Sequence, residues 1–299
     1  MPARFAPALL SAAWVAAGCD TAPSDAEVAA AVIGSPGEVR TYRDTGEGFQ
    51  AAGVAPLQGL TSLDASAEGE VVLMAGLSHR IVPTLLAEYL PQLFVLVAEA
   101  SDPALSRWTA RAWRVDAPGA AMIDPAIVTG PKGRELWFVQ VDGLGDPAEG
   151  GKLSRVVRTR WTGTRFGASS VVYEGVGVVD PSPVFDGEAW RLFLTRNHRE
   201  IIEVSSDRPE PRLVVSGLTV PHVSMVDGTL RLTAQDTSQG PSRAMELAWD
   251  GTAWSAPRAL LPPGDTQPCS SASTVPHDGA RWLFCAGERP GGGGPGAAP

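Results

Sequence analysis

Residues 180–194 read DPSPVFDGEAWRLFL, which is a short apolar strand, an Asp-Gly turn and a second apolar strand. Asp-Gly suits a tight hairpin turn because both turn positions favour positive φ angles. Four further stretches repeat this strand–turn–strand unit: TSLDASAEGEVVL at 61–73, DPAIVTGPKGRELWFV at 124–139, PHVSMVDGTLRL at 221–232 and STVPHDGARWLF at 273–284. Recurrence of one unit along a chain indicates a repeat architecture.

Each repeat has room for two more strands after the first hairpin. The turn glycines stand at 69, 133, 187, 228 and 279, and intervals of roughly 40 to 65 residues suit one four-stranded propeller blade each. The stretches RWTGTRF at 160–166 and AWDGTAW at 248–254 are expected to be equivalent outer hairpins. The sequence therefore predicts an all-β fold, a five-bladed β-propeller of four-stranded antiparallel blades over residues 37–289.

The ends of this propeller are predicted from shorter signals. Residues 38–43, EVRTYR, are expected to supply a strand that closes the ring with the last blade. Helix is expected in under about a tenth of the chain, near 24–32 and 83–90, since long helical periodicity is nearly absent. A pair of β-sandwich domains is the alternative architecture, but it does not explain the regular spacing of the repeats.

The N-terminal region predicts export. Residues 1–18, MPARFAPALLSAAWVAAG, have one basic residue, an apolar stretch and small residues before Cys19, as a secretory signal does. The cysteine at the cut makes the segment resemble a bacterial lipoprotein signal, and the resemblance implies a lipid on Cys19 and a membrane anchor. We expect a signal peptide at 1–18, a lipidated cysteine and tether at 19–36, and a disordered Gly-rich tail at 290–299. An ordinary secretory signal is the alternative.

Composition limits the partners. The net charge is −9, which argues against nucleic acid, because its phosphates require a basic surface. No later segment approaches the ~20 apolar residues of a membrane span. The protein is therefore expected to be exported and lipid-anchored at the cell envelope, periplasmic or on the cell surface. Its expected partners are the membrane, through Cys19, and a glycan or an envelope protein.

Two further cysteines, Cys269 and Cys285, flank the last predicted hairpin. Exported proteins keep disulfides, and the midpoint of the two cysteines lies close to the turn at Asp278-Gly279. A disulfide is the preferred interpretation, and two buried thiols are the alternative.

Polar residues open the first strand of each repeat, and these strands converge on the axis of a propeller. They are Asp64, Asp124, Asp180, Pro221 with His222, and Ser271 to Ser273. Such a ring could bind sugar hydroxyls, with His222 and Ser273 as ligand-binding residues, or a cation such as calcium. No other cofactor is expected.

The segments DPSPVFDG at 180–187 and DPAIV at 124–128 resemble the blade openings of five-bladed glycosidases, the arabinanase, β-xylosidase and invertase group. In that group three acidic residues from successive blades serve as base, pKa modulator and acid. Carried over by blade order, the resemblance implies these roles for Asp64, Asp124 and Asp180. Asp64 is out of register with its turn glycine, and no Glu opens a blade where the group has its acid. The alternative is that Asp124 and Asp180 only cap strand starts.

Three functions follow from these observations. A non-catalytic propeller that binds glycan or protein is the main interpretation. A glycoside hydrolase that uses the channel aspartates is the first alternative, and a structural envelope component is the second.

Overall fold

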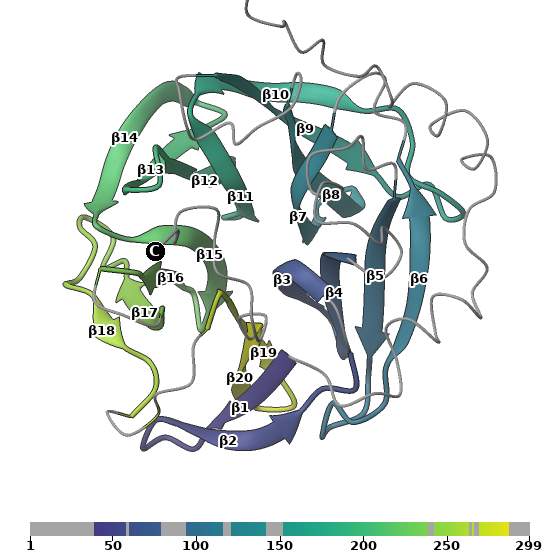
Figure 1. Cartoon of the computed structure of the whole chain (residues 1–299), viewed down its shortest axis with the longest axis vertical. Coiled ribbons are helices and arrows are strands. Elements are labelled where there is room, and N and C mark those ends of the chain that lie inside the picture. Colours follow the sequence, from purple (N-terminus) through teal and green to yellow (C-terminus); the bar gives the residue numbers. More distant parts are fainter. Residues whose placement is uncertain are drawn as a thin grey trace, which may run out of the picture.

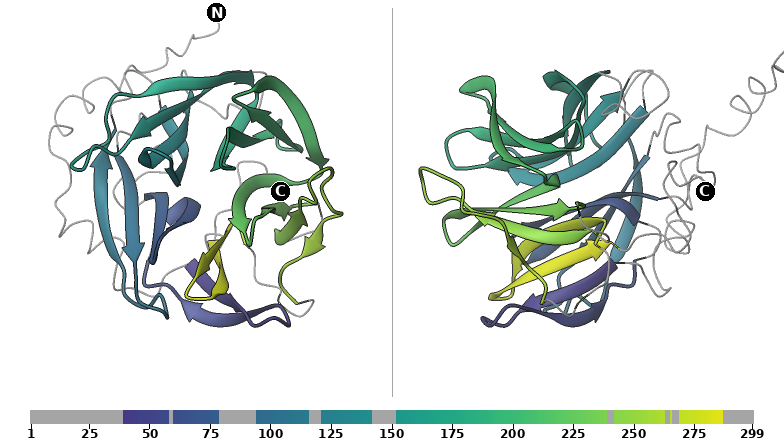
Figure 2. Two further views of the ribbon diagram at one scale, coloured as in Figure 1. Left: turned by 180° about the vertical axis from the view of Figure 1, so that it is seen from behind. Right: turned by 60° about the vertical axis from the view of Figure 1, so that its left-hand side comes forward.

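The computed structural model describes residues 39–57, 60–78, 94–115, 121–141, 152–238, 242–262, 265 and 269–286. These residues form twenty strands in five four-stranded antiparallel sheets, and no helix occurs among them. The sheets stand around a common axis like the blades of a propeller (Figure 1), and each is twisted when seen from the side (Figure 2). The predicted fold is therefore confirmed.

Several predictions concern residues outside this description. They are the signal peptide, Cys19 and its tether, the two short helices and the Gly-rich tail. They stay predictions.

Four blades are each built from consecutive strands. Their bounds, in blade order, are β3 (Leu60–Glu68), β4 (Val71–Ser78), β5 (Phe94–Ala100) and β6 (Thr109–Arg114) in blade 1; β7 (Ala121–Gly130), β8 (Gly133–Val141), β9 (Leu153–Arg160) and β10 (Ser170–Val176) in blade 2; β11 (Val178–Phe185), β12 (Trp190–Arg196), β13 (Glu200–Ser205) and β14 (Arg208–Ser216) in blade 3; and β15 (Thr219–Val226), β16 (Thr229–Asp236), β17 (Arg243–Ala248) and β18 (Arg258–Ala259) in blade 4.

Blade 5 combines both ends of the chain. It consists of β19 (Ser271–His277), β20 (Ala280–Ala286), β1 (Val39–Asp44) and β2 (Phe49–Val54), in that order. Strand β1 pairs with β20 from Val39 opposite Ala286 to Arg43 opposite Trp282. The predicted closing strand is thus present, and it joins the first and last parts of the propeller.

The disulfide between Cys269 and Cys285 is also present. It ties the chain that enters β19 to strand β20, on which the closing strand β1 rests. Both cysteines are completely buried, in a cluster with Tyr42, Phe49 and Leu260 between blades 4 and 5.

Four inner strands share an irregularity near their start. In blades 1 to 4 the register against the second strand shifts within a few residues of the strand start. One residue at each shift has a positive φ angle between 48° and 52°: Ser62, Asp124, Asp180 and Val220. The inner strand β19 pairs with β20 without a shift. These bulges define equivalent positions in the blades.

Asp64 is not the equivalent of Asp124 and Asp180. Ser62 has the equivalent φ angle, and Asp64 lies two residues further along its strand. The residues at the level of Asp64 are Ala126, Ser182 and His222. The carry-over by blade order therefore placed Asp64 at the wrong level, because Ser62 lacks the proline that follows the other two aspartates.

Apolar side chains fill the spaces between neighbouring blades. Trp137 of blade 2 and Trp190 of blade 3 pack with ring centroids 5.1 Å apart. Trp190 also lies against Gly130, where an added Cβ would come within 2.5 Å of Cζ2 of its ring. Glycine is required at position 130 because any side chain would occupy the space of this indole.

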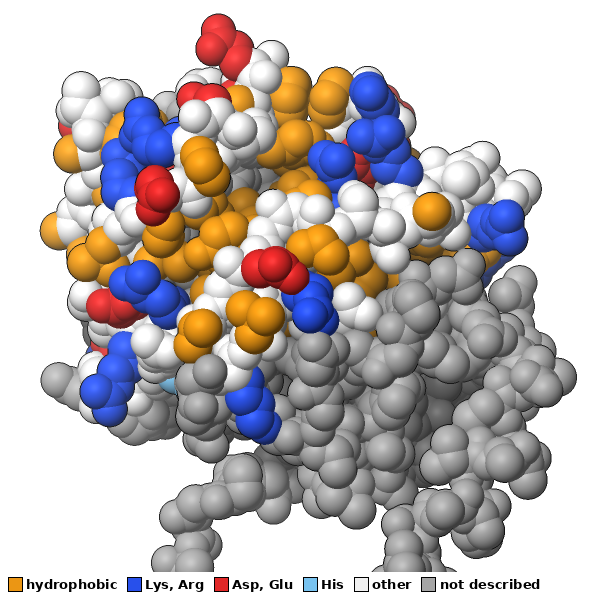
Figure 3. All heavy atoms as spheres, turned by 90° about the horizontal axis from the view of Figure 1, so that it is seen from above, with side chains coloured by type: hydrophobic (Ala, Val, Ile, Leu, Met, Phe, Trp, Pro, Cys, Tyr) orange, Lys and Arg blue, Asp and Glu red, His pale blue; other side chains and the backbone are white. Residues whose placement is uncertain are grey.

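The side of the ring that carries β10 and β14 is an ordinary mixed surface. Figure 3 shows apolar side chains there among positively and negatively charged ones. The exposed apolar residues include Val171 and Val176 of β10 and Leu213 of β14. Single exposed apolar residues of this kind are common on soluble proteins, so they indicate no particular partner.

Removal of the disulfide should destabilise the ring closure. The variant with Cys269→Ala and Cys285→Ala should lose roughly 3 kcal/mol of unfolding free energy, the loop-entropy value for a loop of this size. Denaturant unfolding measures the loss. Reduction of the unchanged protein should have a similar effect, and reduction of the variant none. A protein whose unfolding midpoint does not respond to reduction would contradict this role.

Crowding at Gly130 gives a second stability test. Gly130→Ala should destabilise the protein by about 1–3 kcal/mol, the usual range for overpacking, as measured by denaturant unfolding. Combining it with Trp190→Phe should cost less than the sum of the two single changes, because the smaller ring vacates the space. Strict additivity would show that contact with Trp190 is not the cause.

Candidate functional site

The candidate site lies on the propeller axis, where the five inner strands β3, β7, β11, β15 and β19 meet (Figure 1). Each inner strand contacts the inner strands of the two neighbouring blades. We call the end of the axial channel at which these strands begin the opening mouth. The four bulges lie near this mouth.

Asp124 connects three blades at the opening mouth. Its Oδ1 accepts a hydrogen bond of 3.1 Å from Oγ of Ser62 in blade 1. Its Oδ2 accepts a longer one, 3.4 Å, from the backbone N–H of Asp180 in blade 3. This bond places the Asp124 carboxyl group at the backbone of Asp180, so the two aspartates are neighbours at the opening mouth. Both side chains are half-buried.

Asp64 has a different environment, deeper in the channel. Its Oδ2 accepts a 3.0 Å hydrogen bond from the backbone N–H of Ile127 in blade 2. Its Oδ1 lies 2.7 Å from Nδ1 of His222 in blade 4. Only 14% of the Asp64 side chain and 6% of the His222 side chain are exposed. Both oxygens of Asp64 are therefore engaged within the protein.

The contact between Asp64 and His222 crosses the channel. Blade 5 stands between blades 4 and 1 in the ring, so the two residues belong to blades that are not neighbours. The other ring nitrogen of His222, Nε2, lies 3.0 Å from the carbonyl oxygen of Thr274 in blade 5. His222 thus joins blades 1, 4 and 5 at the axis.

The serines of β19 bind the protein itself. Oγ of Ser271 donates to the carbonyl oxygen of Leu63 at 2.6 Å, and Oγ of Ser273 lies 3.5 Å from the same oxygen. Ser273 is completely buried. These hydroxyl groups join blade 5 to blade 1.

Sequence reasoning missed several hydroxyl side chains around the axis. Ser62 donates to Asp124, Oγ of Ser182 accepts the backbone N–H of Val223, and Oγ1 of Thr195 accepts that of Val220, the last two at 2.8 Å. Serine and threonine carry no signature of such a role in one sequence. A shared distance to the turn glycine, which Ser62 has in common with Asp180, is the one signal that pointed to Ser62.

The chemistry available at the opening mouth is that of paired carboxyl groups. Among the described inner strands, glutamate occurs only at Glu68, at the end of β3. Within the described residues no group of three or more His, Cys, Asp or Glu side chains is arranged to hold a metal ion. A cavity of about 190 Å³ begins at the level of Asp64, Ser182 and His222 and extends toward the ends of the inner strands, and its lining includes neither Asp124 nor Asp180.

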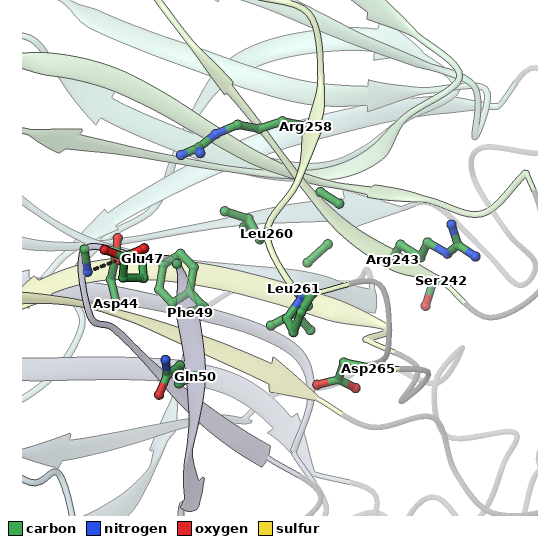
Figure 4. A pocket seen from close by; sticks show the side chains of 15 residues that line it. Asp44, Glu47, Phe49, Gln50, Ser242, Arg243, Arg258, Leu260, Leu261 and Asp265 are labelled. Carbon is green, nitrogen blue, oxygen red and sulfur yellow. Dashed lines mark hydrogen bonds between the residues drawn. The ribbon is translucent and has the colours of Figure 1, made fainter.

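A larger cavity, about 1140 Å³, lies at the outer rim between blades 4 and 5 (Figure 4). Strand β18, whose two residues Arg258 and Ala259 line this cavity, is the shortest strand among the described residues. Phe49, Leu260 and Leu261 form the apolar part of the cavity. Asp44 at one end accepts the backbone N–H of Gly46, and Asp265 at the other accepts a hydrogen bond from Tyr42, whose pKa is raised by burial. Its lining includes neither Asp124 nor Asp180.

Comparison with known proteins identifies the architecture. No protein-family model and no curated protein sequence matches the chain. Among solved structures, the catalytic domain of a GH62 α-L-arabinofuranosidase from Coprinopsis cinerea superposes with a TM-score of 0.54 and 15% identity, covering 79% of this chain and 86% of that one. The native arabinanase of Bacillus subtilis gives 0.52 and 14%, with 78% and 95% covered.

An exo-β-1,3-galactanase from Phanerochaete chrysosporium, solved with galactose, gives a TM-score of 0.53 at 14% identity and covers 85% of this chain. The match spans 63% of the galactanase chain. Likeness at this identity establishes a shared five-bladed fold. The motif-level resemblance to arabinanases is thereby supported for the fold.

Proposed function

We propose that the protein is a glycoside hydrolase that uses Asp124 and Asp180 at the opening mouth of the channel. The observation that supports the proposal is the hydrogen bond between the Asp180 N–H and Asp124 Oδ2, which makes two aspartates at equivalent positions of adjacent blades direct neighbours. Left-handed backbone at a non-glycine residue is costly and is concentrated at functional sites. The shared fold with three glycoside hydrolases adds support.

The two carboxyl groups suit complementary roles. Glycoside hydrolysis requires one protonated and one ionised carboxyl group, about 5 to 9.5 Å apart depending on the stereochemical outcome. Asp124 accepts hydrogen bonds from Ser62 and from the Asp180 backbone, and such donors favour the ionised form. Asp124 is therefore assigned as the base that removes a proton from water. Asp180 is assigned as the acid that protonates the leaving oxygen.

This assignment differs from the roles implied by blade order, which made Asp64 the base. One oxygen of Asp64 accepts a backbone N–H, and the other contacts His222. Asp64 also lies two residues beyond the bulge level that Asp124 and Asp180 share, and only 14% of its side chain is exposed. Asp64 is assigned a structural role instead.

Glycan binding without hydrolysis is the second candidate function. The observation that favours it is the absence of a glutamate from the opening ends of the described inner strands, where the resembling glycosidases have their acid. Asp124 and Asp180 would then bind sugar hydroxyl groups. The same variants separate the two functions.

Substitution of Asp124 and Asp180 tests both candidate functions, hydrolysis and glycan binding without hydrolysis. Asp124→Asn and Asp180→Asn should each lower hydrolysis of a responsive oligosaccharide, chosen from arabino-, xylo- and galacto-oligosaccharides, by about 10²–10⁴-fold. The thermal midpoint should stay unchanged, because the amide keeps the shape of the carboxyl group. Asp227→Asn is the matched control, since Asp227 is exposed in a left-handed turn that asparagine also adopts.

The outcomes distinguish the alternatives. Binding that is measurable by calorimetry and lost in both variants, without product release, would support the second function. A loss of about 1 kcal/mol of stability with no effect on any glycan would show that the aspartates are strand caps, and would overturn both functions.

Export and lipid anchoring remain part of the proposal. None of the described segments is a helix long and apolar enough to cross a membrane. The proposed attachment is through a lipid on Cys19, and Cys19→Ser should move the protein from the membrane fraction to the soluble periplasmic or culture fraction. Immunoblotting of the fractions measures this, with Cys269→Ala and Cys285→Ala as a cysteine control. A Cys19→Ser protein that stays in the membrane fraction would contradict the anchor.

A further inference from the structure

His222 is buried between two hydrogen-bond acceptors. A backbone carbonyl accepts hydrogen bonds only, so the Nε2 atom that lies 3.0 Å from the Thr274 oxygen carries a hydrogen. An ionised carboxylate likewise only accepts, and Oδ1 of Asp64 lies 2.7 Å from Nδ1. A contact this short between two acceptors is repulsive unless a hydrogen lies between them. The pair therefore holds one proton more than a neutral histidine beside an ionised aspartate.

The surroundings favour the histidine as the holder of that proton. The second oxygen of Asp64 accepts the Ile127 N–H, so this oxygen presents a lone pair and not a hydrogen to the protein. The Thr274 carbonyl stabilises a positive imidazole ring. An imidazolium beside a carboxylate leaves the pair electrically neutral, which lowers the cost of burying it.

Through Asp64, the pair of Asp64 and His222 also binds strand β7, which carries Asp124. Strand β3 binds β7 at two points, one at the bulge residue and one beyond the bulge. Ser62 binds the Asp124 side chain, and Asp64 binds the backbone N–H of Ile127. Asp64 also contacts His222, so the bond between Asp64 and the Ile127 N–H depends on a residue from the far side of the channel.

We propose that His222 is a positioning residue of the site. As an imidazolium it holds Asp64 across the channel, and Asp64 in turn fixes the bulge of β7 that presents Asp124. The catalytic consequence rests on the proposed hydrolase function. The protonation of His222 and its effect on strand β7 do not depend on that function, so each is measured in a separate experiment.

The first experiment reads the protonation of His222 in the unchanged protein. Nitrogen-15 NMR of the imidazole rings near neutral pH should show both nitrogens of His222 protonated, and its signals are identified by their loss in His222→Asn. Asp64→Asn should convert the ring to the neutral form. A native His222 with one protonated nitrogen would overturn the assignment, and this reading needs no variant to be active.

The second experiment measures the hold on β7. His222→Asn should increase hydrogen exchange at the Ile127 amide by at least about tenfold, as expected when a protecting hydrogen bond is weakened. Thr233→Val is the matched control. It removes a buried hydroxyl that contacts Oγ1 of Thr274 at 3.0 Å but leaves the bond to Asp64 intact. Equal exchange in both variants would show that His222 has no special hold on this strand.

The third experiment separates positioning from general destabilisation. On a substrate whose hydrolysis requires Asp124, His222→Asn should lower kcat by about 10²-fold, as small misplacements of a reacting group do, with KM changed by less than about threefold. Thr233→Val should retain kcat. An unchanged kcat in His222→Asn would overturn the positioning role. A native protein without hydrolysis would overturn the proposed function, and the protonation and hydrogen-exchange measurements would then decide whether His222 fixes strand β7.

Discussion

The inner strands of this propeller are held together by side chains that accept backbone N–H groups of the neighbouring blade. Asp64 accepts that of Ile127, and Ser182 accepts that of Val223 at the equivalent position two blades on. Each inner strand lies at the edge of its sheet, so the backbone N–H groups that point away from the sheet have no hydrogen-bond partner in a neighbouring strand. An unsatisfied buried N–H costs about 1–3 kcal/mol, and these side chains remove that cost while fixing the spacing of the blades.

The bulges of the inner strands explain why two aspartates lie near the axis. Each bulge turns a residue into the left-handed region and redirects the backbone. At Asp124 and Asp180 the residue that occupies this position is an aspartate, a type that tolerates left-handed backbone better than most. A structural requirement at the bulge thus places the Asp124 carboxyl group beside the backbone of a second aspartate, Asp180. The chemistry proposed for them uses an arrangement that the backbone already needs.

A cluster of ion pairs around a buried glutamate connects strands of blades 4 and 5. Glu246 of β17 is almost completely buried and contacts Arg231, Arg258 and Arg281. Arg281 belongs to blade 5, so this cluster spans the interface beside the ring closure. A buried carboxylate is costly unless it is paired, and here three guanidinium groups share it. Blade 4, whose outermost strand is the shortest, is joined to blade 5 by this cluster and by the apolar contacts around the disulfide.

The sequence by itself determined the repeating hairpins, the number of blades and the closing strand; it favoured the disulfide, and the structure decided between the disulfide and two free thiols. These features depend on local turn chemistry and apolar alternation, which a strand keeps wherever it is placed. Only the tertiary structure decided which polar residues are equivalent. The bulges and the different hairpin turns shift the count between a strand start and its glycine. Ser62 shares its distance to the turn glycine with Asp180 but not with Asp124, so this count alone did not decide that Ser62 is the equivalent residue. The contact of Asp64 with His222 was also beyond the sequence, because it joins residues far apart in the chain across a channel that exists only once the ring has closed.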